Sequence, residues 1–205
     1  MKKSILGLMM LPFLVQAQVG IKAGINFANI TNTAFINNNS RTGYHFGLLL
    51  APQLQSILSS RTELIFSRQG YDYRNNTNTG NVNLDYLMLP QYLSINLPPL
   101  ISIHLGGHLS YLLNAKAGNM NTGGSGTGIN YDDILDVFNR FDFGLGGGVE
   151  LRPAGGLLIG ARVNFSLSKL YDPDANSSGN PAVFIPKDEV KNNVFQIYTG
   201  WLFGQ

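Results

Sequence analysis

Apolar and polar residues alternate with a period of two along most of the chain. From Val19 to Phe27 the odd positions are apolar, whereas glycine, lysine and asparagine occupy the even positions. The same alternation runs from Phe141 to Leu151 and from Leu157 to Leu167. Successive side chains of a β-strand point to opposite faces, so this period indicates strands with one apolar face and one face of glycine, polar and charged residues.

Eight segments show this pattern, and their lengths are typical of strands that cross a membrane. Most have ten to sixteen residues, whereas strands of soluble proteins have about 5–6 and membrane-crossing strands need roughly 9–11. The segments lie near residues 18–30, 41–52, 59–74, 82–97, 100–115, 139–152, 156–169 and 190–204.

The connections between these segments alternate in length. Those at 51–58, 98–99 and 153–155 are short to medium, and those at 31–40, 75–81, 116–138 and 170–189 are medium to long and rich in Asn, Gly, Ser and Asp. Short turns at one end and long loops at the other are the layout of outer-membrane barrels. We therefore expect an all-β fold, an eight-stranded antiparallel up-and-down transmembrane β-barrel.

The first 17 residues have the features of a secretory signal peptide. Lys2 and Lys3 precede an apolar run from Ile5 to Val15, which is too short to span a bilayer as a helix. Small residues at Val15 and Ala17 predict cleavage before Gln18, which is favoured over a buried N-terminal helix. The expected organisation is a signal peptide at 1–17 and an outer-membrane β-barrel domain at 18–205.

Composition indicates which face of the strands points outward. Charged residues make up 13% of the chain, about half of the ~25% usual in soluble domains. A lipocalin-like soluble barrel would hide its apolar face, whereas a membrane barrel exposes it. The polar face carries many of the 24 glycines, and small residues suit the narrow interior of an eight-stranded barrel. We therefore expect the bulky Leu, Ile, Phe and Tyr side chains to face lipid.

This assignment fills the lumen with polar side chains, which should pair because isolated buried charges are costly. The expected lumen network comprises Lys22, His45, Arg61, Glu63, His104, His108, Asp142, Glu150 and Arg162, and Asn26, Gln69, Asn164 and Gln196 share its face. The lumen is thus expected to be a packed polar core and not a water-filled pore. Interfacial girdles are expected from aromatic residues near strand ends, although ordinary strand propensity also explains such residues. These are Tyr44, Tyr73, Tyr111, Tyr171, Trp201 and Phe203.

Several segments resemble the PorT-like outer-membrane β-barrel proteins of Gram-negative bacteria. The similar segments are Gly20–Phe27 (first strand), Glu63–Gly70 (third strand), Tyr86–Pro90 (the "YLEIP" segment, with methionine in place of the acidic residue), Gly107–Lys116 (fifth strand) and Arg140–Gly144 (sixth strand). The resemblance implies an outer-membrane location and a barrel fold. The founding members are associated with a protein secretion system, a role that we do not transfer.

Neither a catalytic site nor a cofactor or metal site is expected. Some eight-stranded barrels act on lipid A with His, Ser and an acid at the bilayer rim, but His45, His104 and His108 all fall on the lumen face. The glycine-rich stretch 123–128 lacks the lysine of a phosphate loop. The segment 172–183 begins like a calcium loop but lacks its glycine and its final glutamate.

Asp132, Asp133 and Asp136 could collect a divalent cation or contact metal bound to lipopolysaccharide, although a solvated acidic loop is favoured. The absence of cysteine excludes disulfides and thiol chemistry, and 12 basic against 12 acidic residues after Lys3 give no case for nucleic acid.

The expected function is therefore a structural or surface-interaction role in the outer membrane, among lipid and lipopolysaccharide. A protein partner would bind the long loops at 116–138 and 170–189. The alternatives are a membrane-embedded lipid A hydrolase or acyltransferase, and a channel for small solutes.

Overall fold

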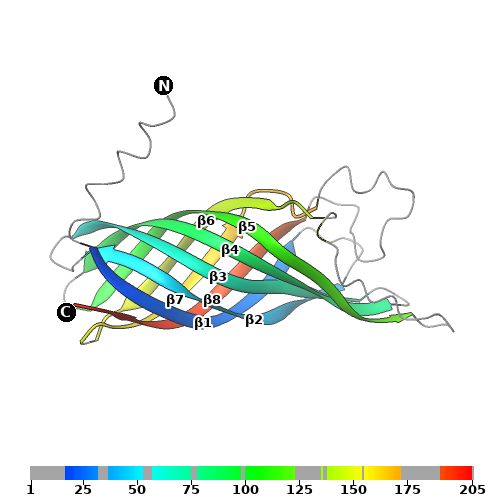
Figure 1. The fold of residues 1–205 in the computed structure, drawn as a ribbon, viewed down its shortest axis with the longest axis horizontal. Helices are drawn as coiled ribbons and strands as arrows, with labels where there is room; N and C mark the ends of the chain where they lie inside the picture. Colours follow the sequence, from blue (N-terminus) through cyan, green and yellow to red (C-terminus); the bar gives the residue numbers. More distant parts are fainter. Residues whose placement is uncertain are drawn as a thin grey trace, which may run out of the picture.

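The chain forms a closed barrel of eight antiparallel strands (Figure 1). The computed structural model describes residues 17–31, 37–52, 57–74, 78–97, 100–122, 135, 138–153, 155–171 and 190–204. The strands are β1 (Ala17–Thr31), β2 (Asn37–Pro52), β3 (Leu58–Arg74), β4 (Asn78–Leu97), β5 (Ile101–Thr122), β6 (Phe141–Leu151), β7 (Leu157–Ser166) and β8 (Lys191–Leu202). Each strand pairs with the next along the chain, and β1 pairs with β8 to close the barrel. The predicted fold class is confirmed.

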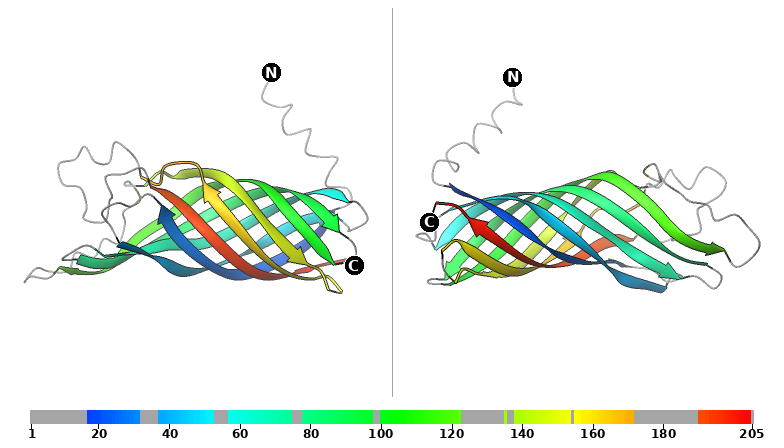
Figure 2. Two further views of the ribbon diagram at one scale, coloured as in Figure 1. Left: turned by 180° about the vertical axis from the view of Figure 1, so that it is seen from behind. Right: turned by 60° about the horizontal axis from the view of Figure 1, so that its bottom comes forward.

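Strand bounds differ from the prediction mainly at β4 and β5. We expected loops at 75–81 and 116–138, but β4 begins at Asn78, β5 continues to Thr122, and the two strands pair to these ends. The reason is that backbone hydrogen bonds extend a ladder whatever the side chains, so the Asn-, Thr- and Gly-rich sequence there gives no alternation to detect. The ends of β3, β4 and β5 consequently project beyond the other strands (Figure 2).

The two ends of the barrel differ. The connections after β2, β4 and β6 lie at the end where β1 begins and β8 finishes, which we call the short-turn end. The connections after β1, β3, β5 and β7 lie at the opposite, long-loop end. In the β6–β7 turn, Gly155 and Gly156 have φ angles of 57° and 87°, a left-handed backbone that side chains other than glycine rarely adopt.

Large apolar side chains cover the outside of the barrel. Ile21, Leu48, Leu105, Phe143 and Ile197 each have about half of their surface exposed. Most of their inward neighbours are polar, charged or glycine, although Leu49 beside Leu48 is a buried apolar residue. The outside is therefore apolar, as a lipid environment requires. No helix among the described residues is long and apolar enough to cross a membrane.

Four layers of side chains fill the lumen, in order from the short-turn end. The apolar cap is Leu49, Ala51, Leu158 and Leu202. The charged layer is Lys22, Arg61, Glu63, Glu150, Arg152 and Arg162, and the amide layer is Asn26, His45, Ser67, Gln69, Asn164, Asn192 and Gln196. The apolar plug is Ile30, Ile65, Tyr71, Val82, Leu84, Tyr86, Met88, Leu112, Ala115, Ala117, Phe138, Leu170, Tyr171 and Val190.

Candidate functional site

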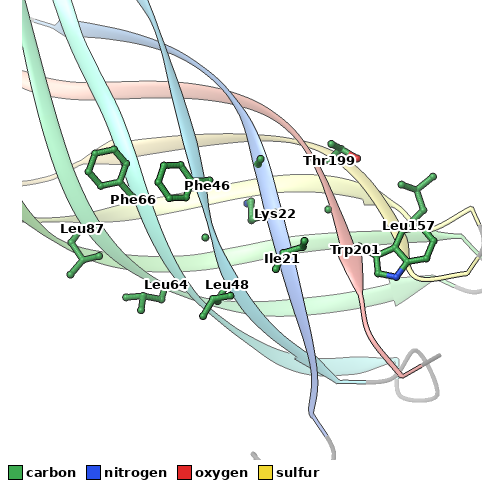
Figure 3. Close-up of a pocket in the computed structure, with 13 residues that line it drawn as sticks. Ile21, Lys22, Phe46, Leu48, Leu64, Phe66, Leu87, Leu157, Thr199 and Trp201 are labelled. Carbon is green, nitrogen blue, oxygen red and sulfur yellow. The ribbon is translucent and has the colours of Figure 1, made fainter.

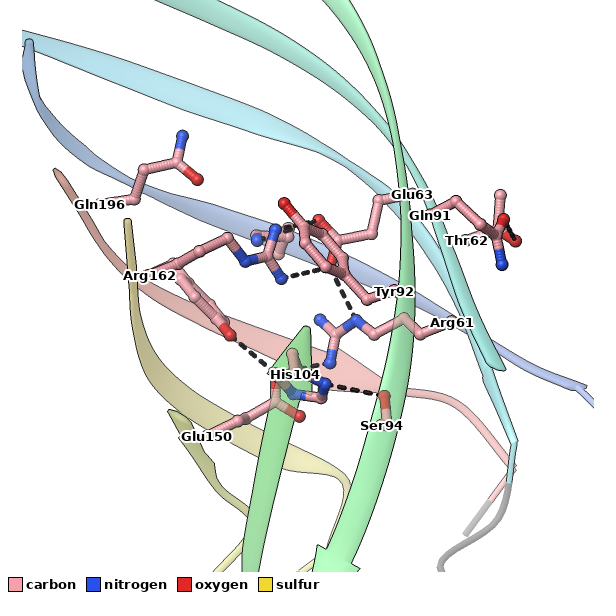
Figure 4. Close-up of polar contacts among 12 residues, drawn as sticks. Arg61, Thr62, Glu63, Gln91, Tyr92, Ser94, His104, Glu150, Arg162 and Gln196 are labelled. Atoms are coloured by element: carbon pink, nitrogen blue, oxygen red, sulfur yellow. Dashed lines mark hydrogen bonds and ion pairs between the residues drawn. The ribbon is translucent and has the colours of Figure 1, made fainter. Parts of the chain in front are cut away.

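Glu63 is the centre of the charged layer. Its carboxylate accepts hydrogen bonds from Lys22 Nζ at 3.2 Å and from Arg61 Nε at 2.7 Å. Arg162 donates through both terminal nitrogens at 2.8 Å, a bidentate pair across the lumen (Figure 4). The four side chains come from β1, β3 and β7 and are buried, so Glu63 joins three strands through one carboxylate.

Glu150 on β6 is the second anion of the layer. Its Oε2 accepts hydrogen bonds from Arg61 Nη1 at 2.6 Å and from the Tyr198 hydroxyl at 3.1 Å. Its Oε1 accepts from Arg152 Nε at 3.0 Å. Arg61 thus bridges the two glutamates, and the charged layer is one connected network.

Tyrosine rings cover two of the cations. Lys22 Nζ lies 3.7 Å from the centroid of the Tyr198 ring, and Arg162 Cζ lies 4.1 Å from that of Tyr92. The negative face of an aromatic ring stabilises a desolvated cation. A Cβ at Gly160 would meet the Tyr198 ring at 2.5 Å, so glycine at this position makes room for the ring.

The amide layer is a chain of hydrogen bonds around the lumen. Asn164 donates to Gln196, Gln196 donates to Asn26, and Asn26 donates to Ser67. His45 Nδ1 lies 2.7 Å from Asn26 Oδ1, so this nitrogen carries the proton. Amide side chains are both donors and acceptors, so a chain of hydrogen bonds can run through such a layer without charged groups.

Ser94, His104 and Glu150 form a row with the residue types of a hydrolytic triad. The Ser94 hydroxyl lies 2.7 Å from His104 Nδ1, and His104 Nε2 lies 3.7 Å from Glu150 Oε2 (Figure 4). All three are at most 1% exposed, and the carboxylate is already bound by Arg61 and Arg152. A substrate has no access to this row in the structure, so the geometry supports a structural role for it.

His108 and Asp142 lie apart from the charged layer, nearer the long-loop end. His108 Nε2 is 3.5 Å from Asp142 Oδ2, and Ser166 and Ser168 both donate to the same carboxylate. Asp142 is half-buried. The nine residues expected in the lumen are therefore placed in three groups: His45 in the amide layer, His108 with Asp142, and the other six in or against the charged layer.

The apolar plug holds the bases of two long connections together. Phe138 and Tyr171 form an isolated antiparallel bridge, and their rings lie 5.0 Å apart. The hydroxyl of Tyr171 is hydrogen-bonded to that of Tyr71. Tyr171 is 8% exposed, so its assignment to an interfacial girdle is wrong; the chain turns inward after β7 and buries the ring.

The other girdle candidates are placed as follows. Tyr44, Trp201 and Phe203 are between 44% and 51% exposed, and Tyr111 is half-buried beside the ring of Phe141. Tyr73 belongs to β3, but its side chain is outside the described residues.

Sequence reasoning missed the interior tyrosines and Arg152. Tyr92 and Tyr198 were expected to face lipid because they are bulky. Their positions nevertheless alternate in phase with the inward-facing Ser94 and Gln196, so strand parity carried the correct signal. Arg152 follows the last residue of β6, where alternation ends.

One groove lies on the outer surface, across β8, β1, β2 and β3. Phe46, Leu48, Leu64 and Trp201 line it around the small side chain of Ala23 (Figure 3). The groove belongs to the apolar exterior of the barrel. No group of three or more His, Asp or Glu side chains suited to a metal occurs among the described residues. Asp132, Asp133 and Asp136 lie outside them.

Comparisons with known proteins agree with this architecture. The family model described as outer membrane protein β-barrel domain matches residues 15–172. No curated protein matches the chain.

Solved structures with the same fold include two of Ail, the attachment invasion locus protein of Yersinia pestis. The first has a TM-score of 0.50 at 15% identity, and covers 92% of this chain and 100% of Ail. The second, in complex with the heparin analogue sucrose octasulfate, has a TM-score of 0.51 at 13% identity and the same coverage, 92% and 100%. Neisserial surface protein A has a TM-score of 0.50 at 16% identity, covering 90% of this chain and 97% of that protein. At such identities the likeness establishes the fold alone.

Proposed function

The chain belongs to the outer membrane protein β-barrel family and lies in the outer membrane, and we propose that it is a sealed barrel that engages a partner at the cell surface. The interaction would use the connections at the long-loop end, 123–137 and 172–189. Long loops of such barrels face the outside of the cell.

The observation that carries this proposal is the anchoring of both loop bases in the apolar plug. Asn139 donates its backbone N–H to Leu170 O at 3.0 Å, and Leu170 donates to Val190 O at 2.9 Å. The Asn139 side-chain amide also donates to Lys169 O and Tyr171 O. The two connections therefore leave the barrel from one shared platform, which favours their acting as one surface.

The charge of the loops indicates the chemistry of the partner. Seven of the twelve acidic residues of the chain lie within 123–137 and 172–189, against one lysine. Ail was solved with a sulfated ligand, but an acidic surface repels sulfate. We propose a partner with basic groups, bound directly or through divalent cations.

Within the broad family, we propose membership of the PorT-like proteins on the strand segments named above, Gly20–Phe27 and Glu63–Gly70 foremost. This finer assignment carries no role in secretion.

The filled lumen argues against the channel alternative, and the position of the histidines argues against a lipid A hydrolase. Charged, amide and apolar layers occupy the interior in succession. We expect reconstituted protein to show little steady conductance in planar bilayers; large stable channels would contradict a sealed lumen.

Photo-crosslinking in intact cells tests the surface interaction. A crosslinking amino acid placed at Ser125 or Ser178 should give a discrete adduct, and the same amino acid at Leu100, an exposed residue in a short turn, should not. Replacing Asp132, Asp133 and Asp136 by Asn should reduce the adduct severalfold. Identical adducts from all three positions, or none from the loops, would contradict the proposal.

A further inference from the structure

The charged layer carries more positive than negative charge. Four cations, Lys22, Arg61, Arg152 and Arg162, meet two carboxylates, Glu63 and Glu150. All six residues are at most 7% exposed. An unbalanced buried charge is costly unless another group compensates it.

Arg61 and Arg152 are the two cations that meet at Glu150. Lys22 and Arg162 each have Glu63 and a tyrosine ring as partners. Arg61 also pairs with Glu63. Among the described residues, the ion-pair partner of Arg152 is Glu150, which it shares with Arg61. The two guanidinium groups bind opposite oxygens of this one carboxylate, so like charges are held side by side.

Each of these two guanidinium groups also has a nitrogen whose N–H donors lack an acceptor among the described protein groups. These nitrogens are Arg61 Nη2 and Arg152 Nη1, and both are buried. A buried donor without an acceptor costs about 1–3 kcal/mol, and more when it is charged. Charge and hydrogen bonding therefore call for the same addition beside the Glu150 carboxylate, an acceptor that is negatively charged.

Arg152 brings this pair of guanidinium groups close to the short-turn end. Arg152 follows β6 at the short-turn end, and its backbone N–H donates to Leu100 O in the neighbouring turn. Its side chain is 5% exposed, whereas that of Arg61 is fully buried. The pair thus reaches from the short-turn mouth into the charged layer.

We propose that Arg61 and Arg152 bind a small inorganic anion such as chloride, as an internal counterion of the lumen. Arg61 Nη2 and Arg152 Nη1 donate to the anion, while Glu150 keeps the two guanidinium groups in place. The site is distinct from the long loops and adds a ligand to a barrel that is otherwise held by its own side chains.

Unfolding in different salts tests the proposal. Refolded protein in lipid vesicles is titrated with urea at fixed ionic strength, with sodium gluconate replaced stepwise by sodium chloride. Ligand that binds only the folded state lowers the unfolding constant about tenfold at ten times its Kd. We expect a saturable rise in the urea midpoint for the natural protein. Arg152→Gln should abolish it, whereas Arg68→Gln, on the outer surface, should retain it.

Bromide locates the ion independently of any variant. Crystals grown in sodium bromide should show an anomalous peak within hydrogen-bond distance of Arg61 Nη2 and Arg152 Nη1. This measurement decides the question even if Arg152→Gln fails to fold. The same midpoint in chloride and gluconate, or no bromide at this position, would overturn the proposal.

Discussion

The two halves of the lumen are filled by opposite chemistry. At the short-turn end the charged layer joins strands through Glu63 and Glu150, and each member depends on a specific partner. At the long-loop end the apolar plug packs Leu112, Phe138 and Tyr171 with their neighbours. A charge network fixes strand register because a shifted charge loses its partner, whereas an apolar cluster tolerates small displacements. The comparison suggests a barrel that is aligned at one end and holds its loops at the other.

The largest effect should follow from removing the shared carboxylate of the charged layer. Glu63→Gln leaves Lys22, Arg61 and Arg162 without their common anion, and breaking a buried ion pair costs about 3–5 kcal/mol. Urea unfolding in vesicles, followed by Trp201 fluorescence, measures the loss. Asp72→Asn is the matched control, because its side chain and that of its partner Arg41 are partly exposed, and ion pairs in contact with solvent contribute about 0–1 kcal/mol. If both variants lose the same free energy of unfolding, the charged layer stabilises the barrel no more than a surface ion pair does.

A cavity in the apolar plug should also destabilise the barrel, and in addition it should make the long loops more susceptible to protease. Leu112 is fully buried, and a core Leu→Ala substitution costs about 2–5 kcal/mol. Leu113→Ala is the control, since Leu113 is 44% exposed on the outside, and it should cost less. Protease cleavage of the loops should accelerate in Leu112→Ala more than in Glu63→Gln at matched stability. If both variants accelerate it equally, the plug has no separate role in holding the loop bases.

The alternation of apolar and polar residues was enough to predict most of the fold and part of the lumen network. A period of two assigns each residue to a face, so Lys22, Glu63 and Arg162 could be placed in the lumen from parity alone. The expectation that bulky side chains face lipid was wrong for Tyr92 and Tyr198. Their parity along the strand placed both inside the barrel. The interior has space for both rings where β6 and β7 carry glycine, at Gly146 and Gly160.

Contacts between particular side chains on distant strands cannot be predicted from a single sequence. The bond between Tyr71 and Tyr171 joins residues far apart in the chain, and so does the pairing of Arg61 with Glu150. Such contacts depend on barrel closure and on the stagger of the strands, which alternation does not determine.

Both halves of the barrel share an apolar exterior. A charged side chain introduced on this outer face tests whether it lies in lipid. Ala161 lies near the middle of β7 on the outer face, between Val149 and Ile197 in register. Arginine at the bilayer midplane of a barrel costs about 2–4 kcal/mol and less near the interfaces. Ala161→Arg should therefore lower the free energy of unfolding by this amount, and Leu167→Arg, beyond the end of β7 on the same face, by less. Equal costs at both positions would show that depth in the membrane does not govern this surface.

The smallest effect should separate the two contributions of Tyr92 within the charged layer. Its ring lies under Arg162, and its hydroxyl donates to Asn164 Oδ1 at 2.8 Å. Tyr92→Phe keeps the ring and removes one hydrogen bond, which should cost about 1 kcal/mol. Tyr92→Leu also removes the ring face, which contributes roughly 2 kcal/mol or more to a desolvated cation. Unfolding of both variants in the same vesicles measures the difference. If Tyr92→Leu lowers the free energy of unfolding no more than Tyr92→Phe does, the ring only fills space. The excess positive charge of the layer is then stabilised in another way. A larger loss for leucine would show that an aromatic face stabilises a buried cation at the short-turn end, whereas the rings of Phe138 and Tyr171 in the apolar plug pack against each other.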